Sequence, residues 1–143
     1  MRLLVYEWCC SGGLTGPDAA ALVPPTASVS ELEPLAREGR AMFRAALDDG
    51  RHSTDLEIHA VVDATRPLEL PAGIQVHPVA AGDELPTLVA AARGCDLTLI
   101  IAPETGGILA TRVAAVRAAG SEVLASGPRL LALAADKQAT ILA

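Results

Sequence analysis

Two glutamates each follow a short apolar run, and each precedes a turn that contains two glycines. Glu7 follows Leu3–Tyr6, and Glu104 follows Leu97–Ile101 and the dipeptide Ala102-Pro103. A carboxylate accepts hydrogen bonds from amines and hydroxyl groups, and glycine lets the backbone approach a ligand closely. The pattern predicts that two loops recognise a small polar substrate. The candidate substrate-binding residues are Glu7, Ser11, Gly12, Gly13, Glu104, Thr105 and Gly106.

Both loops also have an alternative, purely structural interpretation. Ser11–Gly13 lacks the G-x-G-x-x-G spacing of a dinucleotide loop, so a plain tight turn is the alternative there. Glu104 lies at the predicted start of a helix, where a carboxylate interacts favourably with the helix dipole without any ligand. For Trp8, core packing is favoured over stacking on a ligand.

Cysteine and histidine positions predict neither a metal site nor a catalytic residue. The adjacent Cys9 and Cys10 cannot form an ordinary disulfide, and with Cys95 they match no zinc-binding spacing. Reduced thiols and a cytoplasmic location are therefore expected. No Ser/His/Asp or Cys/His pairing emerges from the order of the three histidines, which are His52, His59 and His77.

The elements that must position these loops alternate between strand and helix. Strands are predicted at 2–6, 56–62, 74–77, 97–101 and 122–124. Residues 7–29 read as a long loop. Helices are predicted from the N-cap Ser30 to about 50, from Asp83 to Gly94, and from about Thr105 to Gly120, with further segments opened by Ser126–Pro128 and Asp136. This order predicts a Rossmann-like three-layer α/β/α domain with a mainly parallel sheet. The near-continuous apolar strands 2–6, 56–62 and 97–101 should be neighbours, buried on both faces.

Composition narrows the class of protein further. The chain has 143 residues, the size of one domain, and 51% of them are apolar but only 2% aromatic. The formal net charge is −6, and Lys137 is the single lysine. On charge grounds, neither nucleic acid nor an anionic membrane surface is therefore expected as a partner. The strand beginning at Arg2 leaves no room for a signal peptide, and no apolar run reaches the ~18 residues of a membrane span.

Several short motifs resemble the ATP-grasp ligases. Ala102–Gly107, Gly120–Leu124, Ser126–Pro128 and Asp136-Lys137 resemble the junction between a "pre-ATP-grasp" domain and the ATP-binding domains that follow it. The resemblance divides the chain into a substrate-side domain, 1–134, and the start of a truncated ATP-grasp domain, 135–143. An end inside a predicted helix, without a cap, agrees with that division. The opening motifs Val5–Glu7, Ser11–Gly13 and Glu38–Met42 resemble those of the tyramine–glutamate ligase group, which is linked to methanofuran biosynthesis.

The resemblance implies an enzyme that phosphorylates a carboxylate with ATP and joins the acyl phosphate to an amine. Magnesium would bridge the phosphates. ATP and magnesium would act in the full-length enzyme, with Lys137 reaching ATP, and neither is expected to bind this fragment, which should be inactive alone. The expected partners are a small carboxylate, a small amine and, for assembly, a homodimer. The alternative is a stand-alone Rossmann-like or flavodoxin-like binding or regulatory module without ATP chemistry.

Overall fold

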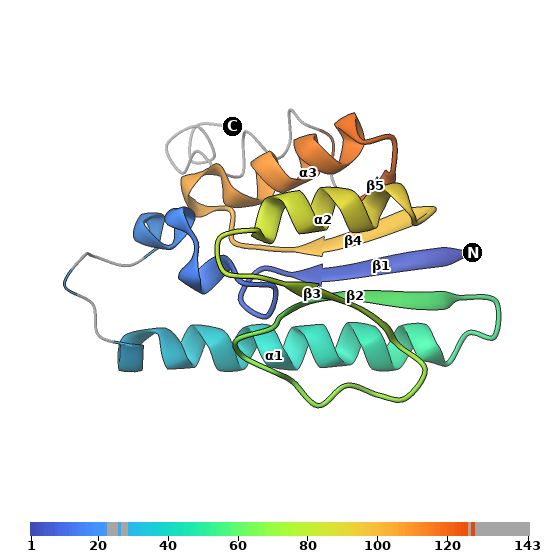
Figure 1. Ribbon diagram of the computed structural model, residues 1–143, viewed down its shortest axis with the longest axis horizontal. Helices are drawn as coiled ribbons and strands as arrows, with labels where there is room; N and C mark the ends of the chain where they lie inside the picture. The colour runs from blue at the N-terminus through green and yellow to red at the C-terminus, as the bar shows by residue number, and fades with distance from the viewer. Residues whose placement is uncertain (23–25, 27–28, 126, 128–143) are drawn as a thin grey trace, which may run out of the picture.

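A computed structural model of the protein describes residues 1–22, 26, 29–125 and 127. Figure 1 shows a sheet between two helical layers. The elements in chain order are β1 (Arg2–Glu7), η1 (Gly13–Thr15), η2 (Pro17–Ala21), α1 (Val29–Arg51), β2 (Glu57–Asp63), β3 (Gln75–Val79), α2 (Glu84–Arg93), β4 (Leu97–Ile101), η3 (Thr105–Gly107), α3 (Ile108–Ala118) and β5 (Glu122–Leu124), where η marks a 3-10 turn.

The sheet has five strands in the order β3-β2-β1-β4-β5, and every pairing is parallel. Leu3 on β1 is in register with Ile58 on one side and with Leu97 on the other. The predicted α/β fold class and the predicted neighbour relation of the three apolar strands are therefore confirmed. β1 lies at the centre, so its carboxyl end meets the loops of both halves of the sheet.

Side-chain alternation along β1 divides the core into two clusters. Leu4 and Tyr6 pack with residues of α2 and α3, whereas Leu3 and Val5 pack with Phe43 and Leu47 of α1. Figure 1 shows the same division, with α1 on one side of the sheet and α2 and α3 on the other. Because successive strand side chains point to opposite faces, the four-residue apolar run Leu3–Tyr6 supplies both cores.

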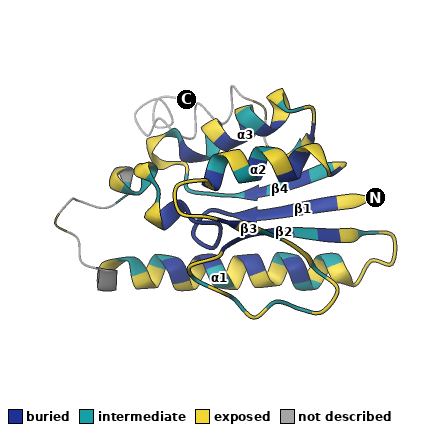
Figure 2. Ribbon diagram, viewed as in Figure 1, coloured by how far each residue is buried: buried dark blue, intermediate teal, exposed yellow. Residues whose placement is uncertain are grey.

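Burial is less complete on β4 than predicted. The strand alternates between buried and half-buried residues, while β1 is buried from Leu3 to Glu7 (Figure 2). The half-buried residues Leu97 and Leu99 belong to the α1 side, where a single helix covers the sheet. The prediction that the strand at 97–101 is buried on both faces is therefore wrong for the α1 face. This gap in the cover leaves space beside the end of β4.

Three other predictions need correction at their boundaries. Residues 7–29 are not one structureless loop, because they contain η1 and η2. Pro17 lies in the first turn of η2, where its fixed φ suits a helical start. Helix α1 begins at Val29, so Ser30 lies inside the helix and does not cap it from outside. The helix expected from Thr105 opens as η3, and α3 itself begins at Ile108.

The C-terminal predictions lie outside the described residues. These are the helix after Ser126–Pro128, the start of a second domain at 135–143, and Lys137. Within the part of the chain that the structure describes, no helix is both long and apolar enough to cross a bilayer.

Candidate functional site

The site lies where the strand order reverses. From β1 the chain adds β2 and then β3 on one side of the sheet, and it then crosses to the other side of β1 to form β4. The loops that follow β1 and β4 therefore leave neighbouring strand ends in opposite directions. The Trp8 amide donates a hydrogen bond to the Ile101 carbonyl over 2.9 Å, which continues the pairing of β1 with β4 one step beyond Glu7. Open α/β sheets bind ligands in the crevice at such a switch point.

Glu7 is the last residue of β1, and its side chain is held between the following loop and α1. It is only 2% exposed, and the Cys10 amide donates a hydrogen bond to its Oε2 over 2.8 Å. A Cβ at Gly39 of α1 would lie 2.7 Å from both carboxylate oxygens. Glycine at position 39 therefore lets helix α1 pass over this carboxylate as it lies, whereas a larger residue would force the carboxylate to move.

The Ser11–Gly13 turn packs into the protein. Ser11 is fully buried, and its hydroxyl donates to the Val61 carbonyl over 2.7 Å. Gly12 has a φ of 94°, and a Cβ at Gly13 would overlap the Trp8 ring. Trp8 is itself fully buried, which confirms the core role predicted for it. The structure thus gives Ser11, Gly12 and Gly13 the geometry of a packed turn that fixes the loop after β1.

The second predicted loop is open to solvent. Glu104, Thr105 and Gly106 are all exposed. Glu104 precedes η3 and makes no side-chain capping hydrogen bond. Gly106 and Gly107 both have a positive φ, 66° and 71°, which reverses the chain before α3 begins. Glu104 therefore lies at the switch point, but the structure does not bring its carboxylate against that of Glu7.

A pocket of about 250 Å³ opens between the end of β1, α1 and residues 101–103. We call it the Glu7 pocket. Its carboxylates are Glu7 and Glu38, and most of its other walls are apolar, from Leu35, Met42, Ile101 and Pro103. Carboxylates beside apolar walls suit a cationic amine with an apolar body. Glu104 lies one residue beyond this lining.

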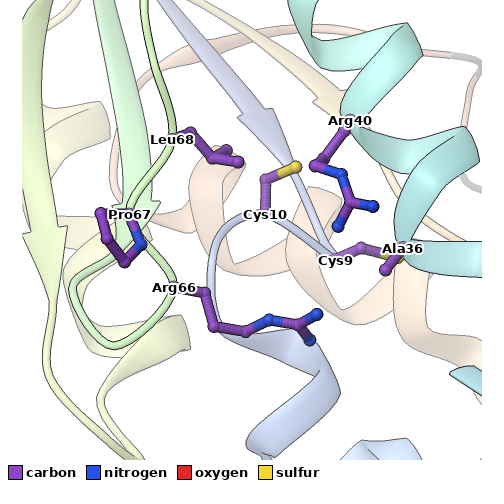
Figure 3. Close-up of a pocket in the computed structure, with 7 residues that line it drawn as sticks. All are labelled: Cys9, Cys10, Ala36, Arg40, Arg66, Pro67 and Leu68. Carbon is purple, nitrogen blue, oxygen red and sulfur yellow. The ribbon is translucent and has the colours of Figure 1, made fainter. Parts of the chain in front are cut away.

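Figure 3 shows the residues that line a second pocket, of about 380 Å³, between α1, the loop after β1 and the β2–β3 connection. We call it the arginine pocket, because Arg40 of α1 and Arg66 of the β2–β3 connection line it. Cys9 lines both pockets, so the two pockets adjoin at this residue. The sequence reasoning missed both arginines. Arg40 had a usable signal, since it lies one helical turn after the core residue Ala36, but Arg66 had none.

The thiols in these walls are not reactive. Burial, followed by the nearby Glu7 carboxylate, raises the pKa of Cys9 to about 12 and raises the pKa of Cys10 as well. Both thiols therefore stay protonated at neutral pH, whereas nucleophilic cysteines need a lowered pKa. Cys9, Cys10 and Cys95 are all free. The chemistry that this arrangement supports is binding.

A buried ionic network occupies the opposite face of the sheet. Arg112 of α3 is 3% exposed and pairs with Glu84 and with Asp18, each at 2.5 Å. The Tyr6 hydroxyl donates a hydrogen bond to Glu84. Burial alone would lower the pKa of Arg112, but the bonds to both carboxylates outweigh it and raise that pKa. The sequence did carry a signal, since Arg112 interrupts the apolar stripe of Leu109, Val113 and Val116.

No metal centre accompanies these groups in the described ranges, where no three histidine, cysteine or acidic side chains gather to hold an ion.

Comparisons with known proteins give a matching domain family and a solved structure with a similar fold. The family model described as the pre ATP-grasp 3 domain matches residues 56–129. A crystal structure of a protein from Archaeoglobus fulgidus, described as belonging to the ATP-grasp superfamily, matches with a TM-score of 0.67 and 23% identity. The match covers 97% of this chain but 37% of that protein, so the chain spans little more than a third of its length. No curated protein matches the chain significantly.

Proposed function

Because the chain belongs to the pre ATP-grasp 3 domain family, we propose that it is the N-terminal, substrate-side domain of an ATP-dependent carboxylate–amine ligase. In this reaction ATP would phosphorylate the acid, and the amine would displace phosphate from the acyl phosphate to form an amide. The domain's own part is to bind and orient substrate, since its described residues offer binding pockets and no reactive thiol.

The observation that carries the proposal is the position of the Glu7 pocket. It combines a buried carboxylate with apolar walls, and it lies at the switch point of the sheet. In the proposed reaction the pocket binds the amine substrate as its ammonium form, with Glu7 as the hydrogen-bond acceptor, and the ammonium loses a proton to solvent before the neutral amine attacks the acyl phosphate. Glu104, exposed at the same strand edge, is proposed to meet the substrate from the side that faces solvent.

The finer proposal is that the enzyme resembles the tyramine–glutamate ligase group of methanofuran biosynthesis. It is supported by the opening motifs Val5–Glu7, Ser11–Gly13 and Glu38–Met42. The first and last of these motifs contribute Glu7, Glu38, Gly39 and Met42 to the Glu7 pocket. An amine with an aromatic body would bury that body against Leu35, Met42 and Pro103.

ATP and magnesium are proposed to bind outside the described residues. Within those residues, Ser11–Gly13 is packed against Trp8 and Val61, and no carboxylate cluster suits a metal ion. Lys137 remains the proposed ATP contact of the full-length enzyme. The residues described thus assign no step of phosphoryl transfer to this domain.

The test uses the full-length protein and compares three single substitutions. Glu7→Gln and Glu104→Gln should each lower kcat/KM for the amine. The expected loss of transition-state stabilisation is roughly 1.5–3 kcal/mol, the value of a hydrogen bond to a charged group. The matched control is Glu122→Gln, at the exposed start of β5, which should leave kcat/KM unchanged. The measurement is amine-dependent release of ADP.

Two outcomes would contradict the proposal. The first is unchanged kinetics for Glu7→Gln and Glu104→Gln, with a loss of stability greater than the ~1 kcal/mol of a helix-dipole interaction for Glu104→Gln. That result would assign both carboxylates to structure. The second is micromolar ATP binding by residues 1–143 in calorimetry, which would favour a self-contained nucleotide module.

A further inference from the structure

We propose that the arginine pocket is a binding site for the carboxylate of a small organic acid, and that Glu33 is its built-in competitor. This inference goes beyond the proposed function, because it concerns equilibrium binding to this chain and requires neither ATP nor amide formation.

Two separate elements bring the guanidinium groups to one pocket. Arg40 projects from α1, and Arg66 projects from the connection that follows β2 (Figure 3). Asp63, at the end of β2, fixes that connection, because its Oδ1 accepts hydrogen bonds from the Thr65 amide and hydroxyl at 2.8 and 2.7 Å. The Arg66 amide then donates to the Asp63 carbonyl over 3.2 Å. Arg66 is thus placed by a defined turn.

Glu33 shows that a carboxylate fits between the two arginines. Its Oε1 lies 2.5 Å from Arg40, and its Oε2 lies 3.8 Å from Arg66. Planar guanidinium groups suit a carboxylate, since they can present two donors to its two oxygens. The hydrogen bond from Arg40 lowers the pKa of Glu33, which keeps that carboxylate charged and competing at neutral pH.

The Glu33 carboxylate can be displaced because it is exposed. Its side chain is 56% accessible, and those of Arg40 and Arg66 are 36% and 37% accessible. Ion pairs between such groups contribute little to stability, since water and salt screen them. A ligand carboxylate that also buries an apolar body can therefore replace Glu33.

The rest of the pocket indicates the kind of anion. Ala36, Pro67 and Leu68 are apolar, and the thiols of Cys9 and Cys10 are protonated and uncharged. Such walls favour the hydrocarbon part of an organic acid over a compact inorganic phosphate, which would keep its hydration. The volume of about 380 Å³ leaves room for a body of several carbon atoms.

The experiment is an NMR titration of the 143-residue chain with butyrate, at neutral pH and low salt. Butyramide, which has nearly the same shape but no charge, serves as the ligand control, and inorganic phosphate tests the other class of anion. We expect butyrate to shift the amide signals of Cys9, Cys10 and Leu68 in a saturable way. Butyramide and phosphate should bind more weakly.

Four variants make the test specific. Arg40→Gln and Arg66→Gln should each weaken butyrate binding by about tenfold or more, the scale of a charged hydrogen bond. Glu33→Gln removes the competitor and should strengthen binding by roughly threefold. The matched control is Arg93→Gln, an exposed arginine on α2, which should change affinity by less than about twofold.

Several results would overturn the inference. Equal binding of butyramide would make the site apolar only, and tighter binding of phosphate would assign another class of anion. Weaker butyrate binding in Glu33→Gln would show that Glu33 supports the site. If Arg93→Gln weakened butyrate binding as much as Arg40→Gln does, the binding would depend on the net charge of the protein and not on this pocket. None of these results depends on ligase activity, so the proposed function can fail while this site stands.

Discussion

Tyr6 and Glu7 are consecutive on β1, yet their side chains enter opposite kinds of surroundings. The Tyr6 hydroxyl reaches the network of Glu84, Arg112 and Asp18 on the α2–α3 face, where Arg112 is 3% exposed. The Glu7 carboxylate lines a pocket on the α1 face. On the first face each charge has an opposite partner already. On the second, Arg40 and Arg66 share one exposed carboxylate beside an open space.

The difference separates charges that hold the fold from charges that are available to a ligand. The α2–α3 face carries two helices over the sheet, and Glu84 and Arg112 are buried beneath them. The α1 face carries one helix, which leaves β4 half-buried beside the Glu7 pocket and leaves the arginine pocket open between α1 and the β2–β3 connection. A buried charge that loses its partner is costly, whereas an exposed charge regains water.

The largest expected effect is the loss of stability on removing the buried Arg112, compared with the removal of an arginine from the α1 face. Arg112→Met should lower the free energy of unfolding by about 3–5 kcal/mol, because Glu84 would be left buried without its partner. Arg66→Met should lower it by less than about 1 kcal/mol. Urea denaturation of both variants measures the two values. Equal losses would remove the distinction between the faces.

A second comparison sharpens the view of the turn after β1. Gly13→Ala should destabilise the protein by about 1–3 kcal/mol, because the new methyl group would overlap the buried Trp8 ring. Gly16→Ala is the matched control in the same loop. There the methyl group would meet only two backbone oxygens, at 3.5 and 3.7 Å, and φ is −86°. Thermal unfolding of both variants measures the difference in stability. An unchanged Tm in Gly13→Ala would show that the turn can move, as it would have to for a ligand.

The smallest expected effect is a pH dependence from the β2–β3 edge. Burial, and then the charge of His59, lowers the pKa of His77, whose ring stacks on His59 at 5.2 Å. Between its folded pKa and the usual value of about 6.5, His77 binds fewer protons in the folded than in the unfolded protein. Its contribution to stability is therefore present above about pH 6.5 and is lost as the pH falls through the folded value.

The measurement is the Tm at about pH 7.5 and at about pH 5.5, across the histidine range. The Tm of the unmodified protein should fall toward the lower pH, and His77→Gln should reduce that fall. His52→Gln, at an exposed position after α1, should leave it unchanged. An undiminished fall in His77→Gln would assign the pH dependence to other groups.

Much of the fold could be predicted because local patterns and tertiary demands agree. Leu3–Tyr6 is apolar at every position, which fits a strand covered on both faces. The alternation of strands and helices predicted that the strands pair in parallel. The half-buried face of β4 could not be foreseen, because its residues Leu97, Leu99 and Ile101 are all apolar. Its partial exposure depends on where α1 lies over the sheet, and no residue within the strand records that position.

The site was predictable only in part for a related reason. Glu7 and the two loops could be placed at the carboxyl ends of neighbouring strands, because strand ends are visible in the sequence. Arg40 and Arg66 are 26 positions apart, and the pocket they share exists only after α1 and the β2–β3 connection have packed against the loop after β1. The packed state of Ser11–Gly13 also depended on a distant partner, the Val61 carbonyl.

Gly39 gives the Glu7 pocket a marker that can be followed through evolution. Because a side chain at position 39 would occupy the space of the Glu7 carboxylate, the two positions are constrained as a pair. A homologue with a larger residue in this turn of the helix must shorten or turn away the acid at the end of its first strand. Glycine at one position together with glutamate at the other is therefore a two-residue signature by which pocket-bearing members of the family can be sorted.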